Sequence, residues 1–188
     1  MLNDLIVNKL SISIINMNII LIGYMASGKS LIGENLSHML NMQFIDFDNY
    51  IEKKEDASIH DIFERKGELY FRKIENAYLK ELLNETKNTV LSLGGGTPCY
   101  GNNMQLIQSF KNNKTVYLNV SVSELSGRLM NDKSKRPLLK YVHSKQDMDE
   151  FVGKHLFERL NYYNQADIIV NANKNPDEVV ENIVLQLF

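Results

Sequence analysis

The chain has 188 residues, of which 44% are hydrophobic and 23% are charged, which is ordinary globular usage and excludes collagen-like, disordered and membrane-bundle classes. Its 21 Lys and Arg stand against 23 Asp and Glu, so no strong field invites nucleic acid or an anionic membrane surface. The length predicts one domain with a sizeable core.

The cysteine content and the first 16 residues indicate the cellular compartment. The single cysteine, Cys99, excludes an internal disulfide framework and favours a reducing compartment. Residues 1–16 contain apolar stretches that polar residues interrupt, too short and too polar to span a bilayer and without the pattern of a signal peptide. We therefore expect a cytoplasmic protein. Residues 1–16 are expected to be a disordered or non-native extension, and residues 17–188 a single domain.

The first half of the chain alternates apolar runs with helical periodicity. Residues 18–22 are apolar and β-branched, as in a strand buried on both faces, and residues 29–40 have helical spacing. Residues 44–46 predict a second strand, residues 58–83 a helix with a break near Gly67, and residues 89–93 a third strand.

The second half continues this alternation. Helices are predicted over residues 102–110 and 123–130. A basic polar stretch at 131–146 follows, then a helix that ends at about Tyr163, and a last helix that begins at Pro176. Strands are predicted over residues 115–120 and 167–170. Five strands that alternate with helices predict an α/β fold, a three-layer α/β/α domain with a five-stranded parallel sheet. Ligands of such sheets bind beyond the carboxyl ends of the strands.

A phosphate-binding loop lies between the first strand and the first helix. Residues 23–30 read Gly-Tyr-Met-Ala-Ser-Gly-Lys-Ser and fit the pattern G-x-x-x-x-G-K-[ST] in its proper context. Backbone N–H groups would converge there on phosphate oxygens at a helix N-terminus. Lys29 would reach the β- and γ-phosphates, and the Ser30 hydroxyl would bind Mg²⁺.

Two further features follow the second and third strands. Asp46 and Asp48 lie two residues apart on a segment that we take as extended, so their side chains would point the same way, one toward a metal and one toward an acceptor hydroxyl. A solvated strand end or a helix cap is the alternative. Gly94, Gly95 and Gly96 are consecutive, which costs backbone entropy, so something is expected to approach the backbone there; a tight turn is the alternative.

Six short motifs occur along the chain in a characteristic order. They are residues 23–30, residues 44–48, Ile62-Phe63 with Gly67-Glu68-Leu69-Tyr70-Phe71-Arg72, residues 91–96, Arg136-Pro137-Leu138-Leu139, and Arg159 with Tyr163. In these motifs the chain resembles the shikimate kinase family from about Met17 to Phe188. The resemblance implies a P-loop NTPase fold like that of nucleoside monophosphate kinases, with a mobile lid over about residues 131–146. It also implies transfer of the ATP γ-phosphoryl group to the 3-hydroxyl of shikimate, giving shikimate 3-phosphate and ADP for chorismate and aromatic amino acid synthesis.

The resemblance also implies residue roles. Arg72 and Arg159 would bind the shikimate carboxylate, which suits their planar forks, and Asp48 would accept from the ring hydroxyls. The backbone of Gly94, Gly95 and Gly96 would approach the ring. The catalytic residues would be Asp48, Lys29 and Arg136, the last acting from the lid, although a solvated basic loop is the alternative reading of that segment.

The substrates expected are ATP and shikimate, with one Mg²⁺ and no nucleic-acid or membrane partner, and the protein is expected to be a monomer. The metal would be held by Ser30 and, through water, by Asp46. The ATP site would comprise Gly23, Ala26, Ser27, Gly28, Lys29, Ser30, Arg128, Arg136 and Lys174.

Three positions depart from the family pattern, and two other functions stay open. Ala26 replaces a P-loop glycine, and because alanine disfavours only φ > 0 we expect a small perturbation. Asn161 replaces a proline, and Lys174 an arginine that often stacks on adenine. A related kinase, such as one for gluconate, is disfavoured by the Gly67–Arg72 segment and the triple glycine. A catalytically silent nucleotide-binding module is disfavoured because the four residues that catalysis needs are all present: Lys29, Asp46, Asp48 and Arg136.

Overall fold

The computed structural model describes residues 17–131, 142 and 144–188. Its centre is a five-stranded sheet with the order β2-β3-β1-β4-β5, in which all neighbouring strands are parallel. The strands are β1 (Asn18–Ile22), β2 (Gln43–Asp46), β3 (Thr89–Ser92), β4 (Asn113–Asn119) and β5 (Ile168–Asn171). The predicted parallel sheet is thus confirmed.

Helices connect these strands. They are α2 (Lys29–Leu40), α3 (Phe47–Glu55), α4 (Ile59–Glu85), the 3₁₀ turn η1 (Thr97–Cys99), α5 (Asn103–Ser109), α6 (Val122–Asn131), α7 (Lys145–Tyr163) and α8 (Pro176–Leu187). The predicted break in the long helix is confirmed, because Gly67 has φ 79° and ψ 170° inside α4. Helix α3 was not predicted.

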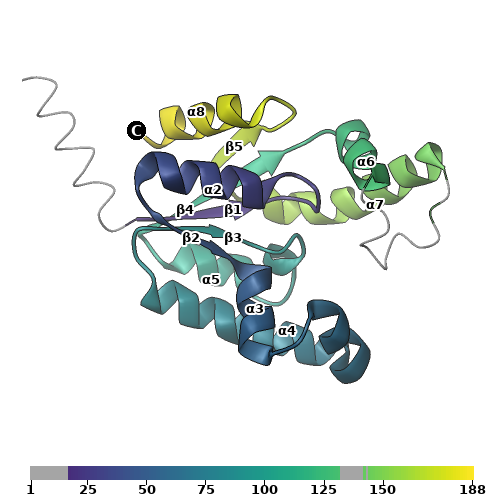
Figure 1. The fold of residues 1–188 in the computed structure, drawn as a ribbon, viewed down its shortest axis with the longest axis horizontal. Coiled ribbons are helices and arrows are strands. Elements are labelled where there is room, and N and C mark those ends of the chain that lie inside the picture. Colours follow the sequence, from purple (N-terminus) through teal and green to yellow (C-terminus); the bar gives the residue numbers. More distant parts are fainter. Residues whose placement is uncertain (1–16, 132–141, 143) are drawn as a thin grey trace, which may run out of the picture.

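The helices cover both faces of the sheet. In Figure 1, α2 and α8 lie on one face, and α4 and α5 on the other. The central strand is therefore shielded completely: Ile19, Ile20, Leu21 and Ile22 are each 0% exposed. Burying each such side chain stabilises the fold by roughly 1.5–3 kcal/mol. Among the described helices, none has both the length and the apolar character needed to cross a bilayer.

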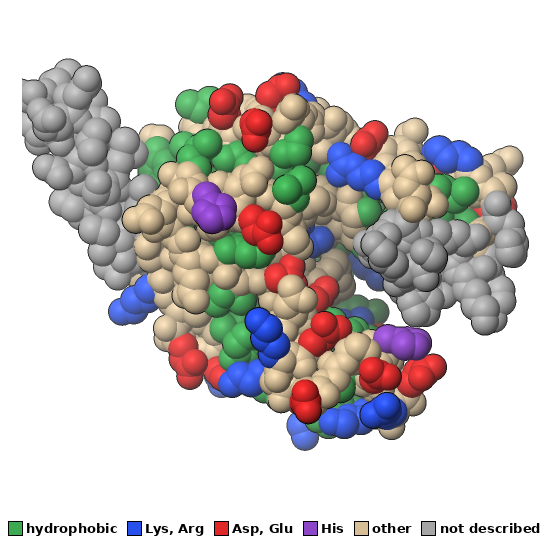
Figure 2. All heavy atoms as spheres, in the orientation of Figure 1, with side chains coloured by type: hydrophobic (Ala, Val, Ile, Leu, Met, Phe, Trp, Pro, Cys, Tyr) green, Lys and Arg blue, Asp and Glu red, His purple; other side chains and the backbone are tan. Residues whose placement is uncertain are grey.

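The register of the sheet places two loops side by side. Leu21 in β1 pairs with Ser92 in β3, and the Leu93 N–H donates to the Leu21 carbonyl at 3.1 Å. The loops that begin at Gly23 and Gly94 therefore leave the sheet at the same level. Figure 1 shows that α3, α6 and α7 lie toward this edge, and Figure 2 shows the surface hollowed there between the α3–α4 part and the α6–α7 part.

Candidate active site

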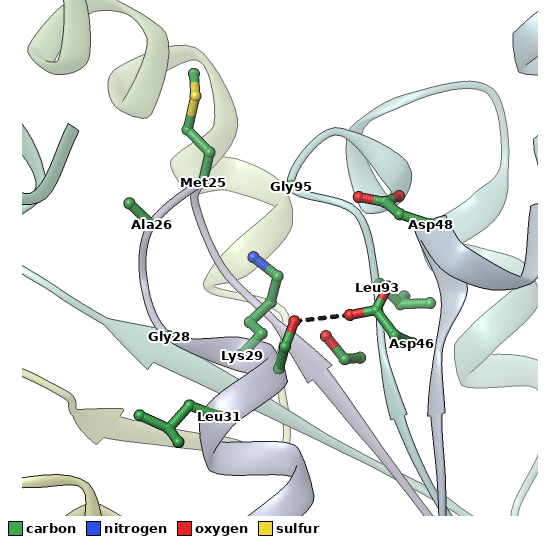
Figure 3. A pocket seen from close by; sticks show the side chains of 11 residues that line it. Met25, Ala26, Gly28, Lys29, Leu31, Asp46, Asp48, Leu93 and Gly95 are labelled. Carbon is green, nitrogen blue, oxygen red and sulfur yellow. Dashed lines mark hydrogen bonds between the residues drawn. The ribbon is translucent and has the colours of Figure 1, made fainter. Parts of the chain in front are cut away.

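The P-loop occupies the turn from β1 into α2. Gly28, the N-cap of α2, has φ 94°, and the helix begins at Lys29. The Lys29 ammonium donates to the carbonyl oxygens of Gly23 and Tyr24, each at 2.9 Å. Figure 3 shows its side chain pointing into a cavity of about 250 Å³. That cavity is lined by Met25, Ala26, Gly28, Lys29, Ser30, Leu31, Asp46, Asp48, Ser92, Leu93 and Gly95.

Two oxygen donors meet on one wall of this cavity. The Ser30 hydroxyl donates to Asp46 Oδ2 at 2.7 Å, the bond drawn in Figure 3. The other oxygen of Asp46 accepts from the Asn49 N–H at 3.2 Å and so caps α3. A hydroxyl and a carboxylate side by side are hard oxygen ligands, the kind that Mg²⁺ prefers. The residues present therefore fit the metal implied by the P-loop.

The prediction that both carboxylates lie on one extended segment is wrong. Asp46 ends β2, but Asp48 lies in the first turn of α3 because the Asp46 side chain starts that helix. The two side chains nevertheless line the same cavity, and Figure 3 shows the Asp48 carboxylate across it from the P-loop. The helix cap that we took as an alternative to metal binding is therefore present at Asp46.

Burial sets the protonation of Asp48. Desolvation, followed by the nearby charge of Asp46, raises the pKa of Asp48 to about 6, although the Lys29 ammonium opposes this shift. A carboxylate with this pKa is largely ionised at pH 7 and is still a better proton acceptor than an ordinary aspartate. Asp48 thus has the properties of a general base.

Each residue of the triple glycine abuts a different part of the site. A Cβ at Gly94 would lie 2.6 Å from Asp48 Oδ1, and one at Gly95 would lie 3.1 Å from the backbone nitrogen of Met25 in the P-loop. A Cβ at Gly96 would lie 3.5 Å from the Arg72 guanidinium nitrogens. Protein groups therefore approach this backbone, and the tight turn that we took as the alternative is present as well, because the Thr97 N–H donates to the Gly94 carbonyl at 3.1 Å. The loop brings the P-loop, Asp48 and Arg72 together.

Arg72 is fixed by an aromatic face and a buried carboxylate. Its guanidinium carbon lies 3.5 Å from the centre of the Tyr100 ring, and Nη1 donates to Glu75 Oε2 at 2.9 Å. Glu75 is only 2% exposed and also accepts from the Thr97 hydroxyl at 2.7 Å. We did not predict Glu75 or Tyr100 as site residues; the spacing of Arg72 and Glu75, i and i+3 on one helix, is the signal that could have identified the first.

Arg159 approaches the same region from α7. Its Nη1 donates to the His155 carbonyl at 3.0 Å, and its guanidinium carbon lies 5.7 Å from the centre of the Tyr24 ring. Burial raises the pKa of the Cys99 thiol to about 11, while both Arg159 and Arg72 act to lower it. Both cations are therefore within electrostatic reach of one thiol.

Tyr163 holds the triple glycine in place from α7. Its hydroxyl donates to the Gly95 carbonyl at 2.5 Å, and its ring stacks on Tyr117 with centroids 5.0 Å apart. The side chain is fully buried, and burial raises its pKa well above the usual range, so the phenol stays a donor. The resemblance included Tyr163 without giving it a role.

A second cavity, of about 380 Å³, lies on the other side of the P-loop. It is lined by Arg128, Lys174 and Pro176 together with P-loop residues Ala26, Ser27 and Gly28. Arg128 spans this region, donating to the carbonyls of Ala26 at 3.1 Å and Ala172 at 3.4 Å. The structure therefore brings Arg128 and Lys174 together beside the phosphate loop. Arg136 and most of the predicted lid lie outside the described residues.

The expectation for Ala26 is wrong. We expected alanine to be tolerated because only φ > 0 would be costly, and Ala26 has φ 62°. In that left-handed region the Cβ of an L-residue crowds the following carbonyl, which costs roughly 1–2 kcal/mol. The missing glycine therefore leaves strain in the P-loop, and the bond from Arg128 to the Ala26 carbonyl helps to hold the strained turn.

The fold and this arrangement define a P-loop kinase of small molecules. The chain belongs to the shikimate kinase family, because a family model described as "Shikimate kinase" matches residues 25–188. Shikimate kinase from Flavobacterium johnsoniae is 46% identical over 167 residues, which cover 88% of this chain and 96% of that relative.

Solved structures agree with this membership. Shikimate kinase from Bacteroides thetaiotaomicron matches with a TM-score of 0.83 at 34% identity and covers 91% of this chain and 98% of that one. Shikimate kinase from Acinetobacter baumannii, solved in complex with shikimate, matches with a TM-score of 0.83 at 30% identity and covers 94% of this chain and 96% of that one.

The strain at Ala26 makes a prediction about stability. Ala26→Gly should stabilise the protein by about 1 kcal/mol, since the relieved strain exceeds the entropy lost by glycine, and should raise Tm by about 2–4 °C. Thermal unfolding measures this. Ala77→Gly, at an exposed position within α4, is the matched control and should lower Tm because glycine destabilises a helix interior. A lower Tm for Ala26→Gly would contradict the strain.

Proposed function

We propose that this protein transfers the γ-phosphoryl group of ATP to the 3-hydroxyl of shikimate, giving shikimate 3-phosphate and ADP. The observation that carries the proposal is the junction at Gly94–Gly96, where Asp48, the P-loop and Arg72 meet. A hydroxyl acceptor beside Asp48 would lie next to the phosphate loop. The carboxylate of shikimate would then lie toward Arg72 and Arg159, whose positive charges complement it.

On this proposal the donor is bound on the P-loop side. Lys29 exchanges its bonds to the Gly23 and Tyr24 carbonyls for phosphate oxygens, and the N–H groups at the start of α2 bind the same phosphates. Ser30 and, through water, Asp46 would hold the Mg²⁺, which would neutralise phosphate charge when bound. Arg128, Lys174 and Pro176 surround the cavity beside the loop, where the nucleoside part of ATP fits.

Asp48 acts on the acceptor. Phosphoryl transfer passes through a loose transition state, so positioning of the acceptor contributes more than a protein nucleophile would. With a pKa of about 6, Asp48 is mostly ionised at pH 7, orients the 3-hydroxyl and accepts its proton as the new P–O bond forms. Arg136 from the lid completes the neutralisation of charge on the transferring group, as the resemblance implies.

Arg72 and Arg159 bind the carboxylate of the acceptor. Glu75 and the Tyr100 ring leave Arg72 partly exposed, with 22% of its side chain accessible, so the guanidinium keeps donors for a ligand. The rings of Phe63 and Phe71, with centroids 4.6 Å apart, pack beside the same guanidinium and supply an apolar wall.

The mobile lid, the disordered or non-native residues 1–16, the cytoplasmic location and the monomeric state remain predictions.

The proposed reaction is tested directly by an ADP-release assay with Mg²⁺ and ATP and with shikimate, gluconate or no acceptor. ADP should form rapidly with shikimate and at the background rate in the other two reactions. Turnover with gluconate alone would identify the related kinase instead. ATP binding without turnover on any acceptor would identify a silent nucleotide-binding module.

The role of Asp48 predicts a loss of turnover and a change in pH dependence. Asp48→Asn should lower kcat by about 10²–10⁴-fold because the proton acceptor is removed, while the Kd for ATP is unchanged. At low concentrations of both substrates, kcat/KM of the wild type should fall below about pH 6, where Asp48 becomes protonated, and this limb should be missing in the variant.

Asp56→Asn is the matched control, because Asp56 is an exposed aspartate at the other end of α3. It should leave both kcat and the pH profile unchanged. Wild-type turnover by Asp48→Asn would remove Asp48 from the reaction.

The role of Arg72 predicts a selective loss of acceptor affinity. Arg72→Ala should raise KM for shikimate by about 10–100-fold, the cost of losing a charged hydrogen-bond pair, with little change in KM for ATP. Arg72→Lys keeps a cation beside Glu75 but loses the fork, so it should also raise KM for shikimate.

Arg65→Ala, at an exposed position on the same helix, is the control and should change neither constant. Equal increases in both KM values for Arg72→Ala would exclude Arg72 from the acceptor site.

A further inference from the structure

A nearly buried carboxylate at the end of α3 receives hydrogen bonds from three side chains of α4. Glu55 accepts from the hydroxyls of Tyr78 at 2.7 Å and Tyr70 at 2.8 Å, and from the Lys66 ammonium at 2.9 Å. Its side chain is only 8% exposed. A carboxylate with three donors and so little solvent contact fixes the distance and angle between the two helices more firmly than a surface ion pair does.

The three donors lie on both sides of the break in α4. Lys66 precedes Gly67, whereas Tyr70 and Tyr78 follow it. With φ 79° and ψ 170°, Gly67 has a conformation that essentially only glycine adopts. Apart from the adjoining residues and the nearby backbone of its own helix, a Cβ at Gly67 would meet no atom of the described residues within 4 Å, so packing against other elements does not fix the bend. Glu55 is bonded to both arms of the bent helix and can fix their relative direction.

The two arms carry different parts of the acceptor site. Phe63 lies before the bend, while Phe71 and Arg72 lie after it, and Phe63 packs 4.6 Å from Phe71 and 5.9 Å from the Arg72 guanidinium. Asp48 lies in the first turn of α3, the helix that Glu55 ends. One carboxylate therefore links the elements that supply the proposed base, the apolar wall and the carboxylate-binding arginine.

The charges in this cluster are permanent over the working pH range. Hydrogen bonds from Tyr78 and Lys66 lower the pKa of Glu55, and the same contact with Glu55 raises the pKa of Tyr78 to about 12. The Glu55 carboxylate therefore stays ionised and the Tyr78 phenol stays protonated near neutral pH. The cluster is therefore a fixed support and does not respond to pH there.

We propose that Glu55 is a positioning residue for the acceptor site. By bonding to both arms of the bent α4, it keeps Phe63 against Arg72 and ties both arms to α3, the helix that carries Asp48. Since the inference rests on the proposed function, it concerns the binding of shikimate and leaves the P-loop unaffected. Glu55 itself contacts no substrate.

The chain contains a matched control for this proposal. Glu81 lies on the straight part of α4 beyond the bend and, like Glu55, joins α3 to α4. It accepts hydrogen bonds from one tyrosine, Tyr50 at 2.9 Å, and one lysine, Lys54 at 2.6 Å. Its side chain is 31% exposed, and both of its donors lie on α3. Breaking this contact loosens the same pair of helices without releasing the bend.

The test compares Glu55→Gln with Glu81→Gln by thermal unfolding and by steady-state kinetics in both substrates. Both variants should lose some stability. Glu55→Gln should raise KM for shikimate about tenfold, as expected when binding groups move by a fraction of an ångström, and leave KM for ATP within about twofold of the wild type. Glu81→Gln should leave both constants within about twofold of the wild type.

The milder variant Tyr70→Phe keeps the test decisive if Glu55→Gln does not fold, because Glu55 retains Tyr78 and Lys66. It should raise KM for shikimate in the same direction by about threefold, the effect of one hydrogen bond. An unchanged KM for shikimate in the folded Glu55 or Tyr70 variant, or an equal increase in Glu81→Gln, would overturn the positioning role. A wild type that does not phosphorylate shikimate would instead refute the proposed function, so the two failures are distinguishable.

Discussion

The close approach of the backbone at Gly94–Gly96 to three neighbours is the constraint on which the site depends. Parallel pairing of β1 with β3 brings this loop beside the P-loop, and a Cβ at Gly95 would crowd the Met25 nitrogen. Gly94 leaves room for the Asp48 carboxylate, and Gly96 leaves room for the Tyr100 ring on which Arg72 lies. Larger residues there would push apart the P-loop and Asp48, which the proposed phosphoryl transfer would need within a few ångströms of each other. The cost of three glycines in backbone entropy is offset by this convergence.

The glycine loop has no side chains with which to hold Arg72 in place, so neighbouring segments supply that support. Glu75 is buried and accepts hydrogen bonds from both Arg72 and Thr97. Since Thr97 directly follows Gly96, these bonds link the arginine to the glycine loop. Tyr163 bonds the Gly95 carbonyl from the opposite side. Leaving one partner of a buried charged pair unpaired costs several kcal/mol, so Arg72 and Glu75 hold each other in place. Lys29, Arg72 and Arg159 are thus each bonded to groups of the protein in the absence of a substrate.

The sequence predicted the parts of this molecule that depend on local pattern. The apolar runs predicted all five strands, and the G-x-x-x-x-G-K-S pattern predicted the loop between β1 and α2. Helix α3 was missed because the Asp46 side chain starts it by accepting the Asn49 N–H, a contact that hydrophobic periodicity does not reveal. Glu75 was missed because its partner Thr97 lies on a distant segment. The left-handed backbone at Ala26 follows from the geometry of the turn, which the residue type alone opposes.

Glycine has two opposite consequences in this fold: it permits close packing in one loop, and it permits a bend in one helix that other contacts must restrain. At Gly94–Gly96 glycine permits close approach, and contacts on both sides then fix the loop. At Gly67 it permits a bend around which a Cβ would touch nothing described, so the bend needs a restraint from elsewhere. Glu55 is suited to that task because a carboxylate has several lone pairs and can accept from Lys66, Tyr70 and Tyr78 at once. Backbone freedom at one residue is thus compensated by a multiply bonded side chain on another helix.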